Sequence, residues 1–472
     1  MSDKQKHKGK KVVVIGAGPG GYAAAFKAAD LGMDVTLVDP AANPGGVCLY
    51  RGCIPSKALL HVVKIQDEAL KAEQYGLQFS KPKVDLSKLR QWKDGVVKKL
   101  TSGLGQLAKS RKVTYVKGTA NFLSDNELSI RSNGKKTTKL SFEYAIIATG
   151  SQPASLPDVE VDHQYVIDST DALKMEKIPK ELLVIGGGYI GLELGSVYTA
   201  LGANVSIAEM SDGFLPGVDR NLVEVLHEET KSLYKSLFFN TRIGQVKVVN
   251  RKVEVVFSEA DKEEKRKYDQ VLVAVGRKPN TADIGLDKVG IVTNDRGFIP
   301  VNIKRQTNKQ HIYAIGDVTG EPMLAHKANR EGRVAAESIA GHQGAGYDPA
   351  SIPAVVFTHP EIAWCGLTEA KAKENKIKHK VLKFPWSASG RAATMGTAKG
   401  LTKLLVDPDS GLILGGGVVG KDAGSLIPEI VLAMEMGSTV EDLALTIHPH
   451  PTLSETIMES AELFLGKATH YG

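Results

Sequence analysis

Short apolar runs that stop at a glycine recur along the chain, and they predict buried strands. Residues 12–15 run into Gly16, and residues 182–185 run into Gly186. A helical segment rich in Ala, Leu or Gly follows each glycine turn, and a second apolar run then ends at an acidic residue. This order of strand, helix and strand is typical of α/β folds with a parallel sheet.

The two units are copies of one pattern, displaced by 170 residues throughout. In a dinucleotide-binding turn the first glycine makes the turn, the second admits the pyrophosphate and the third packs helix on strand. The acid accepts hydrogen bonds from ribose hydroxyls. A single copy also fits a turn that serves packing alone, but two copies in register predict two dinucleotide sites, and hence electron transfer from a nicotinamide to a flavin. The matching residues are Gly16, Gly18, Gly21 and Asp39, and Gly186, Gly188, Gly191 and Glu209.

Further strands are expected at residues 144–150, 271–276 and 311–317, each ending near a glycine. Asp317 follows the last of them, where ligands bind in open α/β sheets, although a turn-forming aspartate also fits. The mixed charge run at residues 258–267 is expected to be a solvated loop. Residues 351–472 contain no further glycine fingerprint and predict a separate α+β domain.

Two cysteines lie close together in the segment GGVCLYRGCIPSK. Cys53 precedes Pro55, which favours the first turn of a helix, and a thiol at a helix N-terminus has a depressed pKa. A redox disulfide between Cys48 and Cys53 is the favoured interpretation. The alternatives are a zinc site with His61, which lacks enough ligands, and two buried structural thiols.

A second chemical motif, HPHPTLSE, lies near the C-terminus and precedes a helical pattern. A histidine there, His448 or His450, could take the proton of a thiol near neutral pH, and the carboxylate of Glu455 would orient it. On local sequence alone, two surface histidines are the more common case, and a metal site has no matching spacing. We expect no metal.

Composition narrows the class of protein further. Lys and Arg number 60 against 53 Asp and Glu, a net charge of +7, and five lysines lie in the first eleven residues. That segment is expected to be a solvated tail, and without a basic stripe in a folded domain we expect no nucleic acid partner. No apolar stretch is long enough for a membrane span, and no signal peptide pattern is found. Three cysteines fit a reducing compartment, so a cytoplasmic location is expected.

Together these motifs resemble the pyridine nucleotide–disulfide oxidoreductases over residues 11–465, most specifically at GGVCLYRGCIPSK, IYAIGDV with MLAHKA, and HPHPTLSE. The resemblance implies an α/β protein with two Rossmann-like dinucleotide-binding domains, for FAD and NAD, and a C-terminal α+β dimerisation domain. The expected domain bounds are 1–153 for the FAD domain, 154–276 for the NAD domain, 277–348 for a central domain that completes the FAD site, and 349–472 for the dimer-interface domain.

The resemblance also assigns roles to single residues. Cys48 would form the mixed disulfide with substrate, and Cys53 would face the flavin. His450, held by Glu455, would be the general base and would act in the partner subunit's site. Lys57 would lie near the flavin and pair with Glu193.

Cofactor contacts follow from the same resemblance, with Tyr189 as a cover for the nicotinamide pocket. Arg51 departs from the common family residue and would lower a thiol pKa if it points inward. FAD would contact Gly16, Gly18, Gly21, Asp39, Lys57, Gly118, Thr149, Gly150, Ser151, Asp317, Met323, Leu324, Ala325 and His326. NAD would contact Gly186, Gly188, Gly191, Glu193, Glu209 and Gly276.

The implied activity is oxidation of protein-bound dihydrolipoamide to lipoamide with reduction of NAD+. The expected partners are the lipoyl domain of a separate acyltransferase or glycine-cleavage carrier protein, the core protein of a 2-oxoacid dehydrogenase complex, and a second copy of the chain. A glutathione-reductase-like enzyme is one alternative, but Glu209 has no arginine after it until Arg220, as a 2′-phosphate would need. A mainly structural docking subunit is the other.

Overall fold

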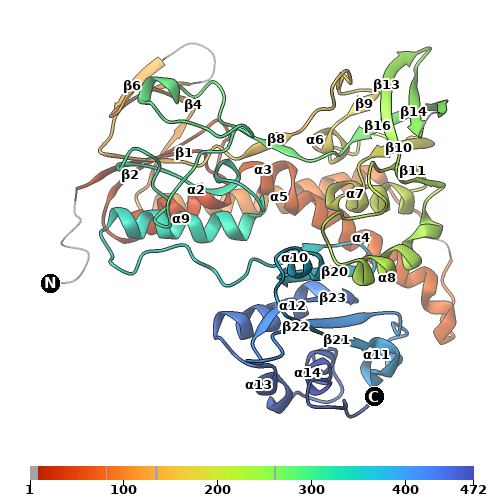
Figure 1. Ribbon diagram of the computed structural model, residues 1–472. Coiled ribbons are helices and arrows are strands. Elements are labelled where there is room, and N and C mark those ends of the chain that lie inside the picture. The colour runs from red at the N-terminus through yellow and green to blue at the C-terminus, as the bar shows by residue number, and fades with distance from the viewer. Residues whose placement is uncertain (1–8, 81, 133–136, 260–261) are drawn as a thin grey trace.

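The computed structural model describes residues 9–80, 82–132, 137–259 and 262–472. The basic tail expected at the N-terminus falls largely on residues 1–8, outside these ranges. Figure 1 shows two sheet-containing regions side by side and the C-terminal part of the chain, in blue, as a separate lobe against them. In the described ranges no helix has the length and apolar character needed to cross a membrane.

The first sheet is parallel and has the order β18-β7-β1-β2-β3. Val12 and Val14 of the central strand β1 face the helices α2 and α9, while Val13 and Ile15 face a small antiparallel sheet. Burial on both faces explains the unbroken apolar run. The elements are β1 (Lys11–Ile15), β2 (Asp34–Asp39), β3 (Thr114–Lys117), β7 (Tyr144–Ile147), β18 (Ile312–Ala314), α2 (Pro19–Asp30), α9 (Ala325–Ile339), and β4 (Thr119–Ser124), β5 (Glu127–Arg131) and β6 (Thr137–Ser141) of the small sheet.

The strand expected at residues 311–317 is β18, and it belongs to the first sheet although it comes after the second in sequence. Helix α9 follows it and packs closely on α2: a Cβ on Gly332 would lie 2.4 Å from the carbonyl oxygen of Gly20. Residues 312–339 therefore complete the first domain.

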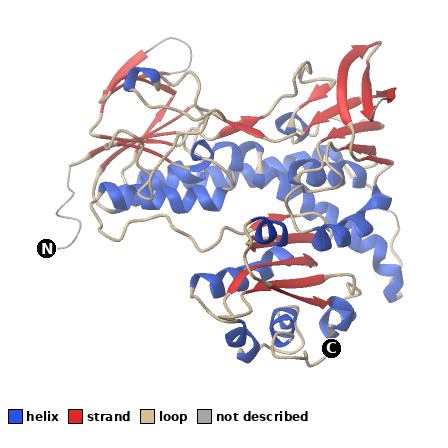
Figure 2. Ribbon diagram, viewed as in Figure 1, coloured by secondary structure: helices blue, strands red, loops and turns tan. Residues whose placement is uncertain are grey.

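The second sheet repeats the first, with the order β12-β11-β10-β16-β9. Leu182 pairs with Val205 as Val12 pairs with Val35, so the 170-residue repeat holds in strand register as well as in sequence. Figure 2 shows helices flanking the strands of both sheets. The elements are β9 (Val166–Ile167), β10 (Glu181–Ile185), β11 (Asn204–Ala208), β12 (Ser236–Phe238), β16 (Gln270–Val273), α6 (Ser169–Ala172), α7 (Tyr189–Ala200) and α8 (Arg220–Thr230).

The charge run expected to be a loop is instead part of a three-stranded antiparallel sheet, so that prediction was wrong. Val253, Val255 and Phe257 on the middle strand are buried and supply the apolar face. The charged strand pairs with it, and Arg266 stacks its guanidinium 4.4 Å from the ring centre of Phe238. The strands are β13 (Arg242–Val249), β14 (Lys252–Glu259) and β15 (Lys262–Tyr268), and residues 260–261 lie outside the described ranges.

The C-terminal part is the expected α+β domain, with one antiparallel sheet in the order β19-β20-β23-β22-β21. Helices α12 and α14 pack against its strands. The elements are β19 (Ala354–Val356), β20 (Glu361–Gly366), β21 (Lys380–Pro385), β22 (Leu401–Val406), β23 (Ile413–Gly420), α10 (Glu369–Glu374), α11 (Gly390–Thr394), α12 (Ala423–Glu435), α13 (Val440–Leu445) and α14 (Glu455–Glu462).

Candidate active site

Both glycine turns have the geometry that the fingerprint predicts. Gly16 and Gly186 adopt φ values of 98° and 110°, and a Cβ on either would collide with a neighbouring carbonyl. A Cβ on Gly188 meets nothing within 4 Å, and one on Gly18 meets only Gly46 at 3.9 Å, so this position is open for a ligand to approach.

The third glycine of each turn serves packing. A Cβ on Gly21 would lie 1.8 Å from the oxygen of Gly16, and one on Gly191 would lie 2.0 Å from the oxygen of Gly186. The three glycines of each copy thus differ in function in the way the sequence suggests.

The acid that ends each second strand also holds its glycine turn. Asp39 accepts a hydrogen bond from the Ala17 N–H at 2.8 Å, and Glu209 accepts one from the Gly187 N–H at 2.7 Å. This positioning by the carboxylate was not predicted from the sequence. Remaining lone pairs on each carboxylate leave capacity for ribose hydroxyls.

A cavity of about 600 Å³ extends from the first glycine turn to the cysteine pair. It is lined by residues from the first sheet, from α3 (Gly46–Arg51) and α4 (Cys53–Lys71), and from α7. The predicted site residues on its wall are Gly16, Gly18, Gly21, Asp39, Cys48, Cys53, Lys57, Gly118, Thr149, Gly150, Ser151, Glu193, Asp317, Met323 and Ala325, together with Arg51 and Tyr189.

Other predicted contacts lie elsewhere. Leu324 precedes α9 and does not border this cavity, and His326 borders a second cavity instead, with its Nε2 atom 2.7 Å from the carbonyl oxygen of Pro353. The remaining predicted NAD contacts, in the second glycine turn, at the acid after it and at Gly276, do not border the cavity. They are Gly186, Gly188, Gly191, Glu209 and Gly276.

The two cysteines lie at the junction of two helices, of which only the one that begins at Cys53 was predicted. Cys48 is on α3, and Cys53 is the first residue of α4, where helix N–H groups favour a thiolate. Both are free thiols in this structure. Cys53 is exposed, and it borders the cavity.

The environment separates the two thiols in acidity. The hydrogen bond from Cys48 and then the charge of Lys57 outweigh burial and lower the pKa of Cys53 to about 7. The same hydrogen bond, with burial, raises the pKa of Cys48. The reduced pair therefore holds its negative charge on Cys53. Arg51 is exposed, and the cation that acts on Cys53 is Lys57.

Lys57 and Glu193 form the expected ion pair, with the ammonium 2.8 and 2.9 Å from the two carboxylate oxygens. Glu193 is 3% exposed, so its charge must be satisfied inside the protein. Ser56 Oγ donates to it at 2.9 Å and the Phe357 N–H at 3.1 Å. The last two partners were missed because neither residue lies in a motif.

Asp317 is held by a polar network with Ser151 and Arg277, two residues that lie on either side of the second domain in sequence. Ser151 Oγ donates to its carboxylate, and Arg277 donates to Ser151 Oγ and to the Ser151 carbonyl, both at 2.7 Å. Arg277 borders the cavity and was not predicted, although it directly follows Gly276 at a strand end.

The predicted pair of His450 and Glu455 is present, and Glu455 is the first residue of α14. His450 Nδ1 lies 2.8 Å from Glu455 Oε1, and the Thr452 N–H donates to Glu455 Oε2 at 2.6 Å. Burial raises the pKa of Glu455, but these hydrogen bonds outweigh it and hold the pKa below its usual range. The His450 side chain is 70% exposed and does not border the cavity at Cys48 in its own chain.

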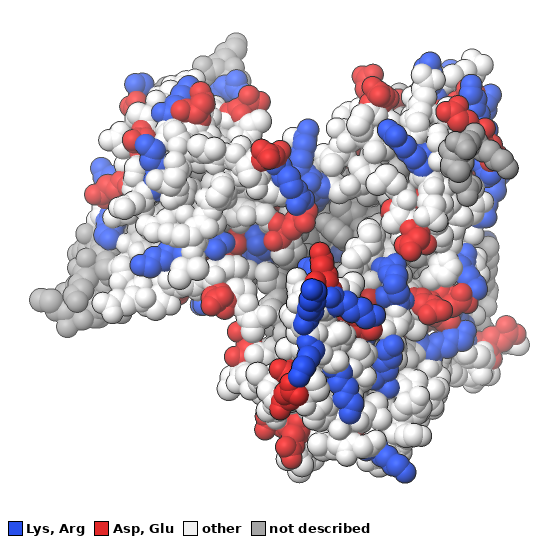
Figure 3. Space-filling view, in the orientation of Figure 1, with Lys and Arg blue, Asp and Glu red and all other residues white. Residues whose placement is uncertain are grey.

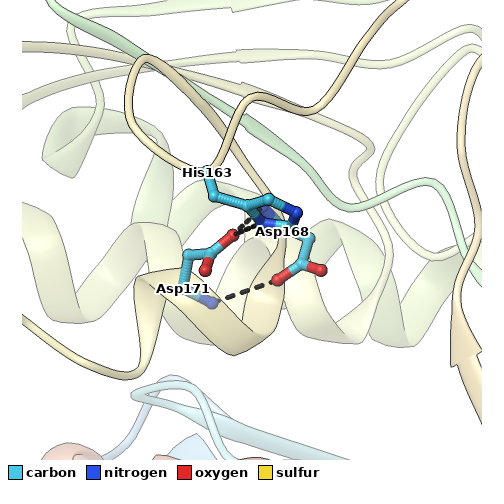
Figure 4. A group of neighbouring side chains, drawn as sticks. All are labelled: His163, Asp168 and Asp171. Atoms are coloured by element: carbon cyan, nitrogen blue, oxygen red, sulfur yellow. Dashed lines mark hydrogen bonds and ion pairs between the residues drawn. The ribbon is translucent and has the colours of Figure 1, made fainter.

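One group of possible metal ligands exists among the described residues, and it is neither the cysteine pair nor the tail motif. It comprises His163, Asp168 and Asp171 (Figure 4). Asp168 caps the N-terminus of α6 through the N–H groups of Thr170 and Asp171, and Asp171 binds His163 at 2.7 Å. These bonds explain the cluster as a helix cap.

Figure 3 shows lysine and arginine side chains interspersed with acidic ones on the visible face. A basic stripe of the kind that follows a nucleic acid backbone is not seen on that face.

Comparison with known families places this chain. The model of the pyridine nucleotide-disulphide oxidoreductases matches residues 10–332, and the model of their dimerisation domain matches residues 352–461. The chain belongs to this family of disulfide oxidoreductases, whose dimerisation domain supports a homodimer.

Its curated relatives are individual enzymes. A dihydrolipoyl dehydrogenase of Haemophilus influenzae is 47% identical over 97% of this chain and 96% of the relative. One of Haloferax volcanii is 44% identical over 98% of both chains. Among solved structures, LpdA from Mycobacterium tuberculosis superposes with a TM-score of 0.89 at 26% identity, over 96% of this chain and 99% of that one.

FAD and NAD are the cofactors of this family, and the residues present fit both. A Cβ on Gly150, as on Gly18, would project into open space at the cavity, and the first turn of α2 presents free N–H groups there for a pyrophosphate. The second glycine turn offers the same features at Gly188 and α7.

Proposed function

We propose that the chain is a dihydrolipoyl dehydrogenase, which oxidises protein-bound dihydrolipoamide and reduces NAD+. One observation carries the proposal: Cys48 borders both the cofactor cavity and a second cavity, whereas Cys53 borders the first and not the second. A substrate dithiol therefore reaches Cys48, while the acidic thiol of Cys53 faces the cofactor. Full-length similarity to dihydrolipoyl dehydrogenases supports the substrate.

The chain's own residues perform thiol–disulfide exchange. A substrate thiolate attacks Sγ of Cys48 in the oxidised pair, the Cys48–Cys53 bond breaks, and Cys53 leaves as a thiolate. Its lowered pKa makes it the better leaving group, and Lys57 holds the charge. The second substrate thiol then attacks the mixed disulfide and releases Cys48. Bound FAD supplies the two-electron link from this dithiol to NAD+.

Proton transfer is assigned to His450 of the partner subunit. Its Nδ1 atom is engaged by Glu455, which leaves Nε2 to accept the proton of the incoming thiol. The His450 of the same chain is exposed and away from the cavity, so each site is complete only in the dimer.

The choice of NAD over NADP rests on Glu209 and Arg220. Glu209 lies at the second glycine turn, where its negative charge repels a 2′-phosphate. Arg220, the nearest arginine after it, donates to the carbonyls of Phe214, Leu215 and Val218 and is not free to bind a phosphate. This arrangement favours NAD and disfavours a glutathione-reductase-like enzyme.

The partners follow from the substrate. We assign the chain to a 2-oxoacid dehydrogenase or glycine-cleavage system, where a separate lipoyl domain delivers the dithiol. The intact cysteine pair and the ordered His450–Glu455 pair support an enzyme over a purely structural docking subunit. Three cysteines, two of them in the redox pair, fit a reducing compartment such as the cytoplasm.

A Cys48→Ser variant tests the proposal. Because Cys48 does not hold the cofactor, the variant should keep its yellow colour and its NADH-to-dye activity. Dihydrolipoamide oxidation should fall by about a thousandfold or more, as for loss of a nucleophile. Cys365→Ser is the matched control, since that buried thiol contacts Met434 and lies outside both cavities. Substantial dihydrolipoamide turnover in Cys48→Ser would refute the role.

A further inference from the structure

A second cavity, of about 550 Å³, also borders Cys48. Among the residues that the structure describes, only Pro19, Cys48 and Ala325 border both cavities. Helices α2, α3, α4 and α9 form the walls of the second. Its full lining is Pro19, Tyr22, Cys48, Leu49, Ile54, Ala325, His326, Asn329, Arg330 and Arg333.

The wall is apolar near the thiol and cationic on α9. Leu49 and Ile54 flank Cys48, whereas Arg330 and Arg333 are three residues apart on α9 and so lie on one face of that helix. Both arginines are exposed, and the lining includes no aspartate or glutamate.

These two cations are largely uncompensated. Across the described parts of the chain Arg333 has no ion pair. The ion pair of Arg330 within the same ranges is with Glu337, at 3.9 Å, and that carboxylate is bound more closely by Lys27 at 3.1 Å. Guanidinium groups left free in this way are suited to bidentate contact with a carboxylate.

We infer that Arg330 and Arg333 are specificity-determining residues that favour carboxylates on the molecule carrying the dithiol. The inference rests on the proposed function, in which that molecule approaches Cys48 through this cavity. The cations attract an anionic carrier and orient it, while the apolar wall takes the hydrocarbon arm. They do not take part in the exchange of sulfur bonds.

The test compares two probes that share one dithiol, dihydrolipoate with its carboxylate and the neutral dihydrolipoamide, on the dimeric holoenzyme. The readout is the kcat/KM for NAD+ reduction with dihydrolipoate divided by the kcat/KM with dihydrolipoamide. In an Arg330→Gln/Arg333→Gln double variant the ratio should fall by about tenfold, as for loss of a charge-assisted contact. In the wild type the ratio should also fall as salt is raised.

Two controls make the result specific. Arg296→Gln removes an exposed arginine that pairs with Glu321 outside the cavity, and it should leave the ratio unchanged. Arg330→Lys/Arg333→Lys keeps the charge and should retain most of the preference. An unchanged ratio in the double Gln variant would overturn the inference. Loss of both activities together with dissociation of the dimer would also overturn it, because the arginines would then be interface residues. Failure of the wild type to oxidise either probe would instead refute the proposed function.

Discussion

At the scale of single residues, the essential feature is the unequal acidity of two neighbouring thiols. Cys53 accepts the hydrogen bond of Cys48 and lies beside Lys57, so the negative charge of the reduced pair stays on Cys53. Glu193 fixes Lys57 in place while being itself buried and saturated by three donors. Charge placement and access together distinguish the two sulfurs.

Removal of the Lys57 charge should make Cys53 less acidic. In Lys57→Met the pKa of Cys53 should rise from about 7 toward the ~8.5 of a free thiol. Iodoacetamide labelling of the reduced enzyme across pH, read at Cys53 by mass spectrometry, measures the shift. Arg51→Gln serves as control because Arg51 is exposed, and it should not move the titration. An equal shift of the Cys53 pKa in both variants would show that Lys57 is not the cation that stabilises the Cys53 thiolate.

At the scale of elements, α14 presents Glu455, the partner of His450, at its first residue and is held by the chain terminus at its other end. Glu459, one turn after Glu455, is 3% exposed and binds both the N–H and the Nδ1 of His470. Glu462 accepts the Thr469 N–H at 2.8 Å. The terminal segment thus fixes the helix that orients Glu455 and His450.

The clamp should depend on pH. Its hydrogen bond to Glu459 raises the pKa of His470 above the ordinary ~6.5. The stabilisation is therefore fully present below ~6.5 and is lost as pH rises through the raised value. The Tm difference between wild type and His470→Gln should be largest near pH ~6 and should shrink in alkaline buffer.

His379→Gln is the matched control for this measurement. His379 is also exposed, but it bonds the carbonyl of Ile377 and no carboxylate. Its Tm difference should not follow the same pH course. A pH-independent difference for His470→Gln would contradict an ionic clamp.

The sequence was sufficient for the parallel sheets, because the glycine at each turn and the acid at each strand end are local requirements. The sequence was not sufficient for β15. This charged strand pairs with β14, whose apolar face stabilises the sheet, and the charge pattern of β15 does not reveal that pairing. At the site it predicted the cysteines, Lys57 and Glu193. It missed Arg277 and Phe357, whose roles arise only when distant segments meet.

At the scale of the whole molecule, the second domain and the C-terminal domain are joined by ion pairs of very different burial. Lys403 is fully buried and binds both Asp219 and Glu369 at 2.5 Å. Burial raises the pKa of Glu369, but the bond to Lys403 outweighs it and lowers the pKa below its usual range. Lys399 pairs with Glu229 across the same boundary, yet it is 78% exposed.

The two lysines should therefore differ in their contribution to stability. Lys403→Met leaves two partly buried carboxylates without their fully buried cation and should cost about 3 kcal/mol, whereas Lys399→Met should cost about 0–1 kcal/mol. Denaturant unfolding of both variants under one set of conditions measures the difference. Equal and small effects would show that the buried network does not hold the domains together.

The most direct test of the proposed function is the initial rate of NAD+ reduction by dihydrolipoamide on the purified dimer. The same preparation is assayed in parallel with NADPH and oxidised glutathione. The cysteine pair, His450 of the partner subunit and Glu209 together predict a fast first reaction and a negligible second. A fast second reaction and a negligible first would contradict both the substrate and the nucleotide assignment.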